Sequence, residues 1–360
     1  MGDPTMSDAT EKHNNIPSPV CVRPFVLKRT NFIFSESSQQ IKNNRDDKKN
    51  ETLLQYRLKT LWLFTFSDLK TIVVPSTAFA ILTALSGPSL TTNSSVPSLS
   101  ELFPRLPLVL AWIWLTLLLV DIANQRHPGS VLEDSLNKPW RPLPSGRIST
   151  YGARRLLLIA IPSVLAITKF FLPQGLPVTI IAIIGSYMYN DLGGADESFL
   201  VRNLMNAAAI TCFGAGAAQV AIGEQVALNV DAYRWLAIIA AIVTTTMQVQ
   251  DMEDQEGDRA KGRVTIPLLL GDVTARHSIA VLVSAWSFVC PAYWGLNALG
   301  YVLPGAVGLT IAGRTLTMRN VQADKDNWRA WNIWMMTLYL LPVWEDIFST
   351  VASNEIEDGG

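Results

Sequence analysis

The sequence predicts an all-α membrane protein, and three observations indicate this fold class. Of its 360 residues, 49% are hydrophobic and only 16% are charged, whereas an ordinary soluble domain has about 25% charged residues. The charged residues collect in a few short segments that separate long apolar stretches. Lysine and arginine are concentrated in alternate loops, which is typical of a polytopic chain. The net charge of −1 gives no reason to expect a nucleic-acid partner.

The two ends of the chain differ in composition from its centre. Residues 1–50 are polar and rich in Asn, Ser and Lys, so we expect a disordered cytosolic tail without a secretory signal peptide. Residues 51–350 would form the transmembrane domain, and residues 351–360 a second short tail. The three cysteines, Cys21, Cys212 and Cys290, are far apart, and their spacing predicts neither a disulfide nor a zinc site.

Nine apolar stretches have roughly the length that a helix needs to cross the hydrocarbon core, which is about 20 residues. A helix ahead of them, over residues 52–66, has an apolar stripe that suits the membrane surface. The predicted spans are 69–88, 106–123, 153–172, 176–190, 199–222, 233–250, 277–295, 299–313 and 329–348. Eight spans remain possible, because residues 277–313 contain Pro291, Gly295, Gly300 and Pro304.

The distribution of positive charge predicts the orientation of these spans. If the N-terminus is cytosolic, the loops at 124–155, 190–203, 251–277 and 314–329 lie on its side and hold 15 Lys and Arg residues. The opposite loops hold two, Arg105 and Arg234. Since Lys and Arg are enriched on the cytosolic side, we expect the N-terminus to be cytosolic.

A first charged cluster, residues 121–149, follows the second predicted span directly. Pro128 and Gly129 must interrupt the helix here, so the polar residues fall on both sides of a break. They are Asn124 before the break and Ser130, Glu133, Asp134, Lys138, Arg141 and Arg147 after it.

A second charged cluster, residues 248–272, lies at the end of the sixth predicted span. Asp251, Asp254 and Asp258 are spaced i, i+3 and i+7, which places them within about 60° of one another on a helix. Three carboxylates on one face repel one another unless a cation lies among them. Lys261 and Arg263 follow at once.

Both clusters lie in predicted cytosolic segments, so they can meet at one side of the membrane. Mg²⁺ prefers oxygen ligands and usually bridges one or two carboxylates to the phosphates of a substrate. Two acidic clusters that are each followed by Lys and Arg therefore predict a receptor for Mg²⁺ and a diphosphate. The alternative interpretation, solvated and highly charged loop ends, is reasonable for the first cluster alone but does not account well for both.

The segments "NKPWRPLPSGRIS" and "DMEDQEGDRAKGRVTIPLLLG" resemble the two signature regions of the UbiA superfamily of intramembrane prenyltransferases. The resemblance extends from about residue 60 to residue 350. It implies nine transmembrane helices around a central cavity that the acidic motifs cap from the cytosol. It also implies Mg²⁺ as cofactor, a prenyl diphosphate as substrate and lipid as surroundings, and the sequence points to no obligate protein partner.

The resemblance assigns roles by position in the two motifs. The implied metal ligands are Asn124, Glu133, Asp134, Asp251, Asp254 and Asp258, with the four aspartates as catalytic residues. The implied diphosphate-binding residues are Lys138, Arg141 and Lys261, with Arg202 and Lys70 as further basic candidates at cytosolic ends of spans.

The first motif departs from the family pattern. Asn124 lies ten residues before Asp134 instead of eight, and Ser130 stands where a middle aspartate is usual. A Tyr-x-x-x-Lys motif of the family is also missing, since Tyr187 is followed four residues later by Asp191. The altered motif is similar to a fungal branch that contains membrane-bound terpene cyclases. The resemblance thus implies a cyclase of fungal terpenoid metabolism, in the endoplasmic reticulum, that acts on farnesyl or geranylgeranyl diphosphate.

Two other functions were weighed. A prenyltransferase would use the same diphosphate residues and pass the prenyl group to an aromatic or lipid acceptor. A transporter would place ionisable groups near the middle of the bilayer, where a charge costs at least about 2.5 kcal/mol. The interiors of the predicted spans have almost no charged residues, because Lys169 and Glu345 lie near span ends. The sequence therefore favours an enzyme.

Overall fold

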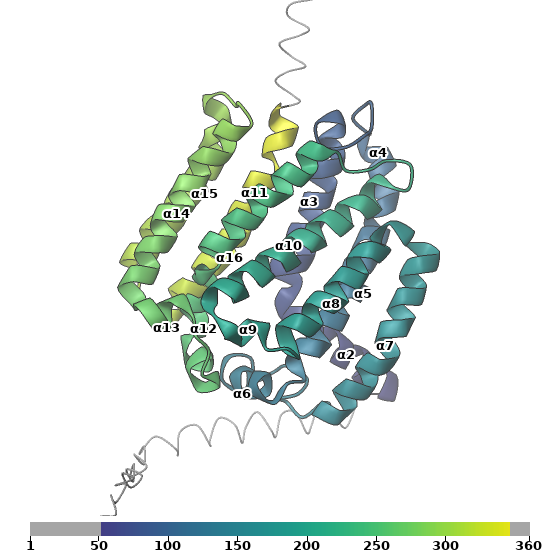
Figure 1. Ribbon diagram of the computed structural model, residues 1–360, viewed down its shortest axis with the longest axis vertical. Helices are drawn as coiled ribbons and strands as arrows, with labels where there is room; N and C mark the ends of the chain where they lie inside the picture. Colours follow the sequence, from purple (N-terminus) through teal and green to yellow (C-terminus); the bar gives the residue numbers. More distant parts are fainter. Residues whose placement is uncertain (1–51, 346–360) are drawn as a thin grey trace, which may run out of the picture. The chain divides into compact units, whose positions relative to one another are not determined.

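The computed structural model describes residues 52–345, and its regular elements there are helices and helical turns, with one isolated β-bridge between Thr91 and Leu228 (Figure 1). The predicted all-α class is therefore confirmed. The chain divides into two units, and the description below concerns the second, from Arg57 onward. The two predicted tails and Cys21 lie outside the described residues.

A helix overlaps each of the nine stretches that the sequence predicts as spans, as far as residue 345. These helices are α3 (Val74–Leu85), α5 (Leu106–Gln125), α7 (Thr150–Phe171), α8 (Leu176–Asn190), α10 (Phe199–Ile222), α11 (Val230–Thr246), α14 (Asp272–Tyr293), α15 (Ala298–Thr317) and α16 (Val321–Tyr339). Other helices connect or precede them: α2 (Leu53–Thr65), α4 (Leu99–Leu102), α6 (Pro128–Asn137), α9 (Gly194–Glu197), α12 (Gln248–Lys261) and α13 (Ile266–Leu270). Helices α2 and α3 are joined by a 3₁₀ turn, Phe66–Asp68, and a π-helical turn, Leu69–Val73.

By length and hydropathy alone, four helical segments within residues 52–345 qualify as membrane spans. They are Leu53–Leu85, Leu99–Gln125, Phe199–Ile222 and Asp272–Tyr293. A fifth is added if α11 and α12, which are bent by 42° at a short break, count as one span. Some of the other predicted spans are short or partly polar: α8 has 15 residues, and the first half of α16 contains Asp324 and Arg329.

Helix α10 lies between α11 and α8 and contacts α3 and α5 as well (Figure 1). Its small buried residues allow this close approach: a Cβ atom on Gly216 would lie 2.2 Å from the ring of Trp112 on α5. The indole Nε1 of Trp112 donates hydrogen bonds to the carbonyl oxygen of Gly175 and the hydroxyl of Thr179. Trp112 thus packs the centre of the helix bundle, and its polar atom is satisfied.

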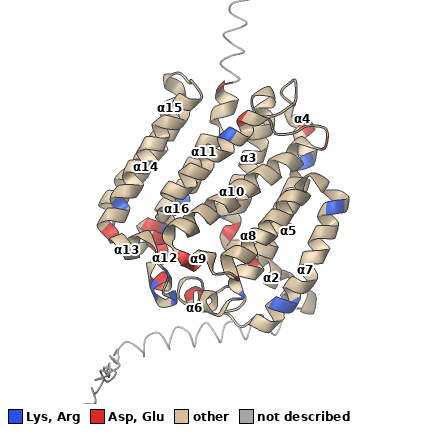
Figure 2. Cartoon of the chain, viewed as in Figure 1, with Lys and Arg blue, Asp and Glu red and all other residues tan. Residues whose placement is uncertain are grey.

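The short helices α6, α9, α12 and α13 lie together at one end of the bundle, and Figure 2 shows that many of the charged residues gather there. The predicted break at Pro128 and Gly129 is present, since α5 ends at Gln125 and α6 begins at Pro128. Helix α12 ends at Gly262, which adopts the left-handed conformation (φ 76°) that glycine accommodates without strain. Both acidic motifs therefore lie on short helices that follow the ends of long apolar ones.

Candidate active site

Helices α6 and α12 pack against each other and bring the two acidic motifs to the same end of the bundle. The guanidinium of Arg263, which follows α12, lies 3.0 Å from Glu133 on α6. The ammonium of Lys261 lies 3.6 Å from the other oxygen of Glu133. A Cβ atom on Gly257 would come within 2.3 Å of the Asn137 amide, so glycine is what allows the end of α6 to cover α12.

Asp251, Asp254 and Asp258 all lie on the buried face of α12, as their spacing predicts. Two of the three carboxylates already have an arginine partner. Asp251 accepts a 2.6 Å hydrogen bond from Arg202 on α10, and Asp258 accepts one of 2.8 Å from Arg263. No side chain in residues 52–345 makes a hydrogen bond or ion pair with the Asp254 carboxylate, although Lys138 lies near enough to interact with it electrostatically.

Oxygen atoms on this face fit a divalent cation. Oδ2 of Asp251 and Oδ2 of Asp258 are buried and have no hydrogen-bond partner, an arrangement that is costly for a carboxylate unless a further ligand is present. Within the described range, no three His, Cys, Asp or Glu side chains form a complete metal-binding group. Mg²⁺ does not require one, because it usually keeps waters and phosphate oxygens beside one or two carboxylates.

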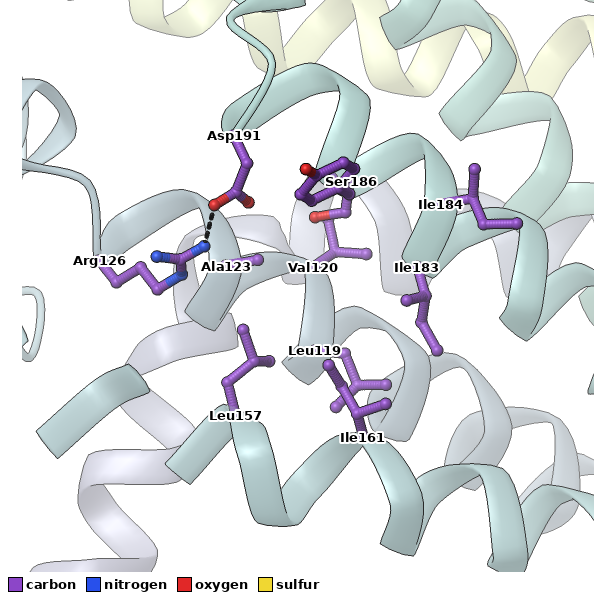
Figure 3. A pocket seen from close by; sticks show the side chains of 11 residues that line it. Leu119, Val120, Ala123, Arg126, Leu157, Ile161, Ile183, Ile184, Ser186 and Asp191 are labelled. Carbon is purple, nitrogen blue, oxygen red and sulfur yellow. Dashed lines mark hydrogen bonds and ion pairs between the residues drawn. The ribbon is translucent and has the colours of Figure 1, made fainter. Parts of the chain in front are cut away.

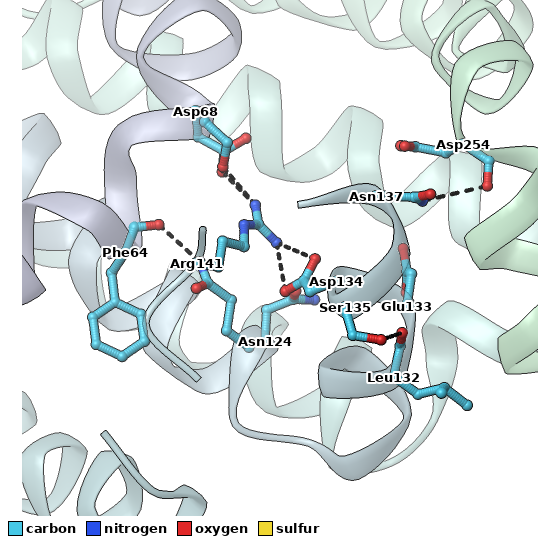
Figure 4. Close-up of polar contacts among 12 residues, drawn as sticks. Phe64, Asp68, Asn124, Leu132, Glu133, Asp134, Ser135, Asn137, Arg141 and Asp254 are labelled. Atoms are coloured by element: carbon cyan, nitrogen blue, oxygen red, sulfur yellow. Dashed lines mark hydrogen bonds and ion pairs between the residues drawn. The ribbon is translucent and has the colours of Figure 1, made fainter. Parts of the chain in front are cut away.

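In the first motif, Asp134 is buried and forms a two-pronged ion pair with Arg141 (Figure 4). Both carboxylate oxygens of Asp134 accept hydrogen bonds from Nη1 of Arg141, at 2.9 and 3.0 Å. Nη2 of the same arginine donates to Ser67 at 2.5 Å and to Asp68 at 3.3 Å. Ser67 and Asp68 belong to the 3₁₀ turn after α2, so the first motif is tied to the beginning of the first predicted span.

Two predicted site residues have contacts of a different kind. The amide of Asn124 donates a 2.9 Å hydrogen bond to Asn190 at the end of α8, and within residues 52–345 it makes no hydrogen bond with a carboxylate of the motifs. Lys70 lies in the π-helical turn, is exposed, and makes no ion pair with another described side chain. Asn124 and Lys70 thus have fewer contacts with the two motifs than the other predicted site residues, which are Glu133, the four aspartates, Lys138, Arg141, Arg202 and Lys261.

Burial and neighbouring charges set the pKa values at this end of the bundle. Seven of the 14 residues of α12 are charged, so we place α12, like α6 and the loop after it, outside the apolar layer. Burial raises the pKa of Asp258 to about 6 although Arg202 and Arg263 oppose the shift. Burial likewise raises the pKa of Asp134 against the effect of Arg141.

Two other groups show the opposite balance between burial and charge. Burial alone would raise the pKa of Glu133, but Arg263 and Lys261 outweigh it and hold the pKa below its ordinary value. Burial alone would lower the pKa of Lys138, but the carboxylates of Asp254, Asp68 and Asp134 together outweigh it and raise the pKa. Glu133 and Lys138 are therefore charged at neutral pH, and each is stabilised by a charge from the other motif.

Several charged residues at this end were given no role in the site from the sequence. Arg263 contacts three acidic groups, namely Glu133, Asp258 and Asp196 on α9. Asp121 is buried within α5, and Asp68 contacts Arg141. The sequence signal for both aspartates was a single acidic residue inside or beside a long apolar stretch, which is an expensive position for a charge.

An apolar pocket of about 430 Å³ lies between α5, α7 and α8 (Figure 3). Its walls are mostly aliphatic, and its polar end has the ion pair of Arg126 and Asp191. None of the predicted metal-binding carboxylates lines it. The lining residues are Leu119, Val120, Ala123, Arg126, Leu157, Ile161, Ile183, Ile184, Ser186, Tyr187 and Asp191.

Comparison with known families agrees with this arrangement. The model of the UbiA prenyltransferase family matches residues 80–338, which include both acidic motifs. The chain belongs to this family. The resemblance inferred from the two signature regions is therefore confirmed.

Two curated relatives are similar to this UbiA-family chain over most of their length. Fumagillin beta-trans-bergamotene synthase of Aspergillus fumigatus is 29% identical over 286 residues, which cover 79% of this chain and 92% of the relative. Somaliensene A/B synthase of Streptomyces somaliensis is 31% identical over 283 residues, which cover 76% and 88%. These relatives agree with the branch that the altered first motif indicates.

The fold also matches a solved structure of digeranylgeranylglyceryl phosphate synthase in membranes. The TM-score is 0.51 at 18% sequence identity, and the match covers 79% of this chain and 96% of the other. This likeness supports the UbiA-type helical fold.

Proposed function

We propose that this UbiA-family protein is a membrane-bound terpene cyclase that ionises a linear prenyl diphosphate and cyclises the resulting carbocation. One observation carries the proposal: two acidic motifs, interleaved with buried arginines and a lysine, meet at one end of an apolar helix bundle. The two similar synthases support cyclisation, and the missing Tyr-x-x-x-Lys motif argues against ordinary aromatic prenyl transfer.

The proposed roles follow from charge and position. Asp134, Asp251, Asp254 and Asp258 would hold Mg²⁺, with Glu133 and Asn124 as additional ligands. Lys138, Arg141, Lys261, Arg202 and Lys70 would bind the diphosphate. Support comes from the buried carboxylate oxygens of Asp251 and Asp258 that lack partners and from the cations that already pair with these acids.

Substrate binding would exchange these partners. In the structure, Arg141, Arg202 and Arg263 are each paired with an aspartate. A diphosphate can accept hydrogen bonds from these arginines while the aspartates turn to the metal. When bound, Mg²⁺ would neutralise negative charge on the diphosphate oxygens as the carbon–oxygen bond breaks. The buried arginines and Lys138 would stabilise the same developing charge, and they act strongly because water is scarce around them.

The carbocation would then be folded among apolar and aromatic side chains and would lose a proton to give the product. Its environment must exclude water, because water would trap the cation. Trp112, Trp331 and Trp334 belong to the buried core of the bundle, and aromatic faces stabilise cations by about 0.5 to 2 kcal/mol each. Their indole N–H groups are hydrogen-bonded within the protein. Packing in the core is therefore a sufficient explanation for these three tryptophans without a role in catalysis.

We further propose that all nine long helices cross the membrane, with the N-terminus and both motifs on the cytosolic side. The charge distribution in the loops supports this orientation, and the position of α6, α9, α12 and α13 at one end of the bundle supports a single cytosolic cap. The catalytic domain would comprise residues 51–350. The endoplasmic reticulum is the membrane that we propose for it.

Product analysis tests the proposed function. Membranes that contain the protein should release a cyclic hydrocarbon from farnesyl or geranylgeranyl diphosphate when Mg²⁺ is the only addition, because cyclisation needs no acceptor. Gas chromatography with mass spectrometry of a hexane overlay would identify the product. A reaction that depends on an added aromatic or lipid acceptor would instead establish the prenyltransferase alternative. Membranes without the protein serve as the control.

A further inference from the structure

Arg141 is buried between two sets of partners that come from different parts of the chain. On one side, Nη1 contacts both oxygens of Asp134, which is a proposed metal ligand. On the other side, Nη2 contacts Ser67 and Asp68 from the turn before the first predicted span (Figure 4). Ser67 also donates a 2.9 Å hydrogen bond to Asp68. If Asp134 turns toward a metal, only the second set remains to hold the guanidinium.

Asp121 lies next to this second set, on α5, and is only 7% exposed. Its carboxyl group interacts electrostatically with Asp68 and with Arg141. The guanidinium therefore has an acidic neighbour on α5 as well as in the turn.

The contacts with Ser67 and Asp68 restrict the orientation of the Arg141 side chain. Arg141 lies in the loop between the end of α6 and the start of α7, and its long side chain would gain rotamer freedom if its ion pair with Asp134 broke. Ser67 and Asp68 lie between α2 and α3, in an irregular stretch that includes a π-helical turn, and such turns are frequent at functional sites.

Building on the function proposed above, we propose that Asp68 is a positioning residue. Together with Ser67, it keeps the Arg141 guanidinium directed at the diphosphate when Asp134 turns to the metal. Asp68 does not touch the substrate in this proposal. It acts through Arg141.

The test measures binding of inorganic pyrophosphate in the presence of Mg²⁺ to the purified full chain, by calorimetry, together with KM and kcat. Asp68→Ala should weaken pyrophosphate binding by about tenfold, since it removes a charge-assisted partner of the arginine. KM for the prenyl diphosphate should rise by a similar factor.

A matched control removes a buried aspartate partner from an arginine elsewhere. Asp324 on α16 contacts Arg276 on α14 at 2.8 and 2.9 Å. Asp324→Ala should lower thermal stability and leave pyrophosphate affinity of the folded protein unchanged. If Asp68→Ala does not fold, Asp68→Asn replaces it, and this variant should still lose affinity because it lacks the charge.

The outcomes separate this inference from the proposed function. If the wild type does not bind pyrophosphate with Mg²⁺, the proposed function itself fails. If the wild type binds it and the Asp68 variants bind equally tightly, the positioning role of Asp68 is wrong while the proposed function stands. Equal losses in the Asp68 and Asp324 variants would also overturn the inference, because they would indicate a general effect of stability.

Discussion

Replacing Asp254 by alanine should reduce turnover by at least about 10²- to 10³-fold while the protein still inserts and folds. Asp254 is the proposed metal ligand whose carboxylate has no hydrogen bond or ion pair with another described side chain. Its removal breaks no hydrogen bond or ion pair of the carboxylate and takes from Lys138 only an electrostatic neighbour. The loss should therefore appear mainly in function and only slightly in stability. Turnover of prenyl diphosphate and thermal stability in detergent would be measured on the same preparation.

A control for this variant lies on the same helix. Glu256 is two residues away from Asp254 but is exposed, so Glu256→Ala changes the charge of α12 by the same amount on its outer face. This control should retain turnover within about twofold, as surface substitutions usually have small effects. Nearly normal turnover of Asp254→Ala would mean that the second motif has been assigned the wrong role.

Asp251→Ala should be severely destabilising in addition to inactive. Asp251 is fully buried and pairs with Arg202, which is only 4% exposed. Removing one partner of a buried ion pair leaves the other charge uncompensated and typically costs about 3–5 kcal/mol. Thermal unfolding in detergent, followed by light scattering or intrinsic fluorescence, would show a large decrease in Tm relative to the wild type.

A double substitution separates the two effects. Asp251→Leu combined with Arg202→Met removes both buried charges, and replacing an ion pair by apolar residues is often neutral for stability. We expect the double variant to recover most of its Tm but no activity. Asp231→Ala is a suitable control, because its pair with Arg234 is 51% and 66% exposed and such pairs contribute at most about 1 kcal/mol. A double variant as active as the wild type would contradict the proposed role of Asp251.

The sequence predicted features that depend on local chemistry. Long apolar stretches become helices, Pro128 and Gly129 break a helix, and three aspartates share one face of α12. The meeting of the two motifs followed from charge in the loops, because loops on one side of a membrane can approach one another. These predictions needed no knowledge of which side chains would become partners.

Other features depend on tertiary contacts and could not be predicted. Nothing in the spacing of residues shows that Arg202 on α10 faces Asp251 on α12, or that Asp68 contacts Arg141 across more than seventy residues of sequence. Asn124 pairs with Asn190 because α5 and α8 lie side by side. The number of spans also depends on tertiary packing, because short or partly polar helices such as α8 and α16 are buried only by contact with neighbouring helices.

Dependence on a divalent cation tests the central claim most directly. Purified protein with farnesyl or geranylgeranyl diphosphate should show no turnover in excess EDTA, and addition of Mg²⁺ beyond the chelator should restore it. The buried oxygens of Asp251 and Asp258, which have no partner in the structure, are the physical basis for this expectation. Restoration should fail in the Asp254→Ala variant. Normal turnover of the wild type in EDTA would contradict the claim that the two acidic motifs act by holding a metal.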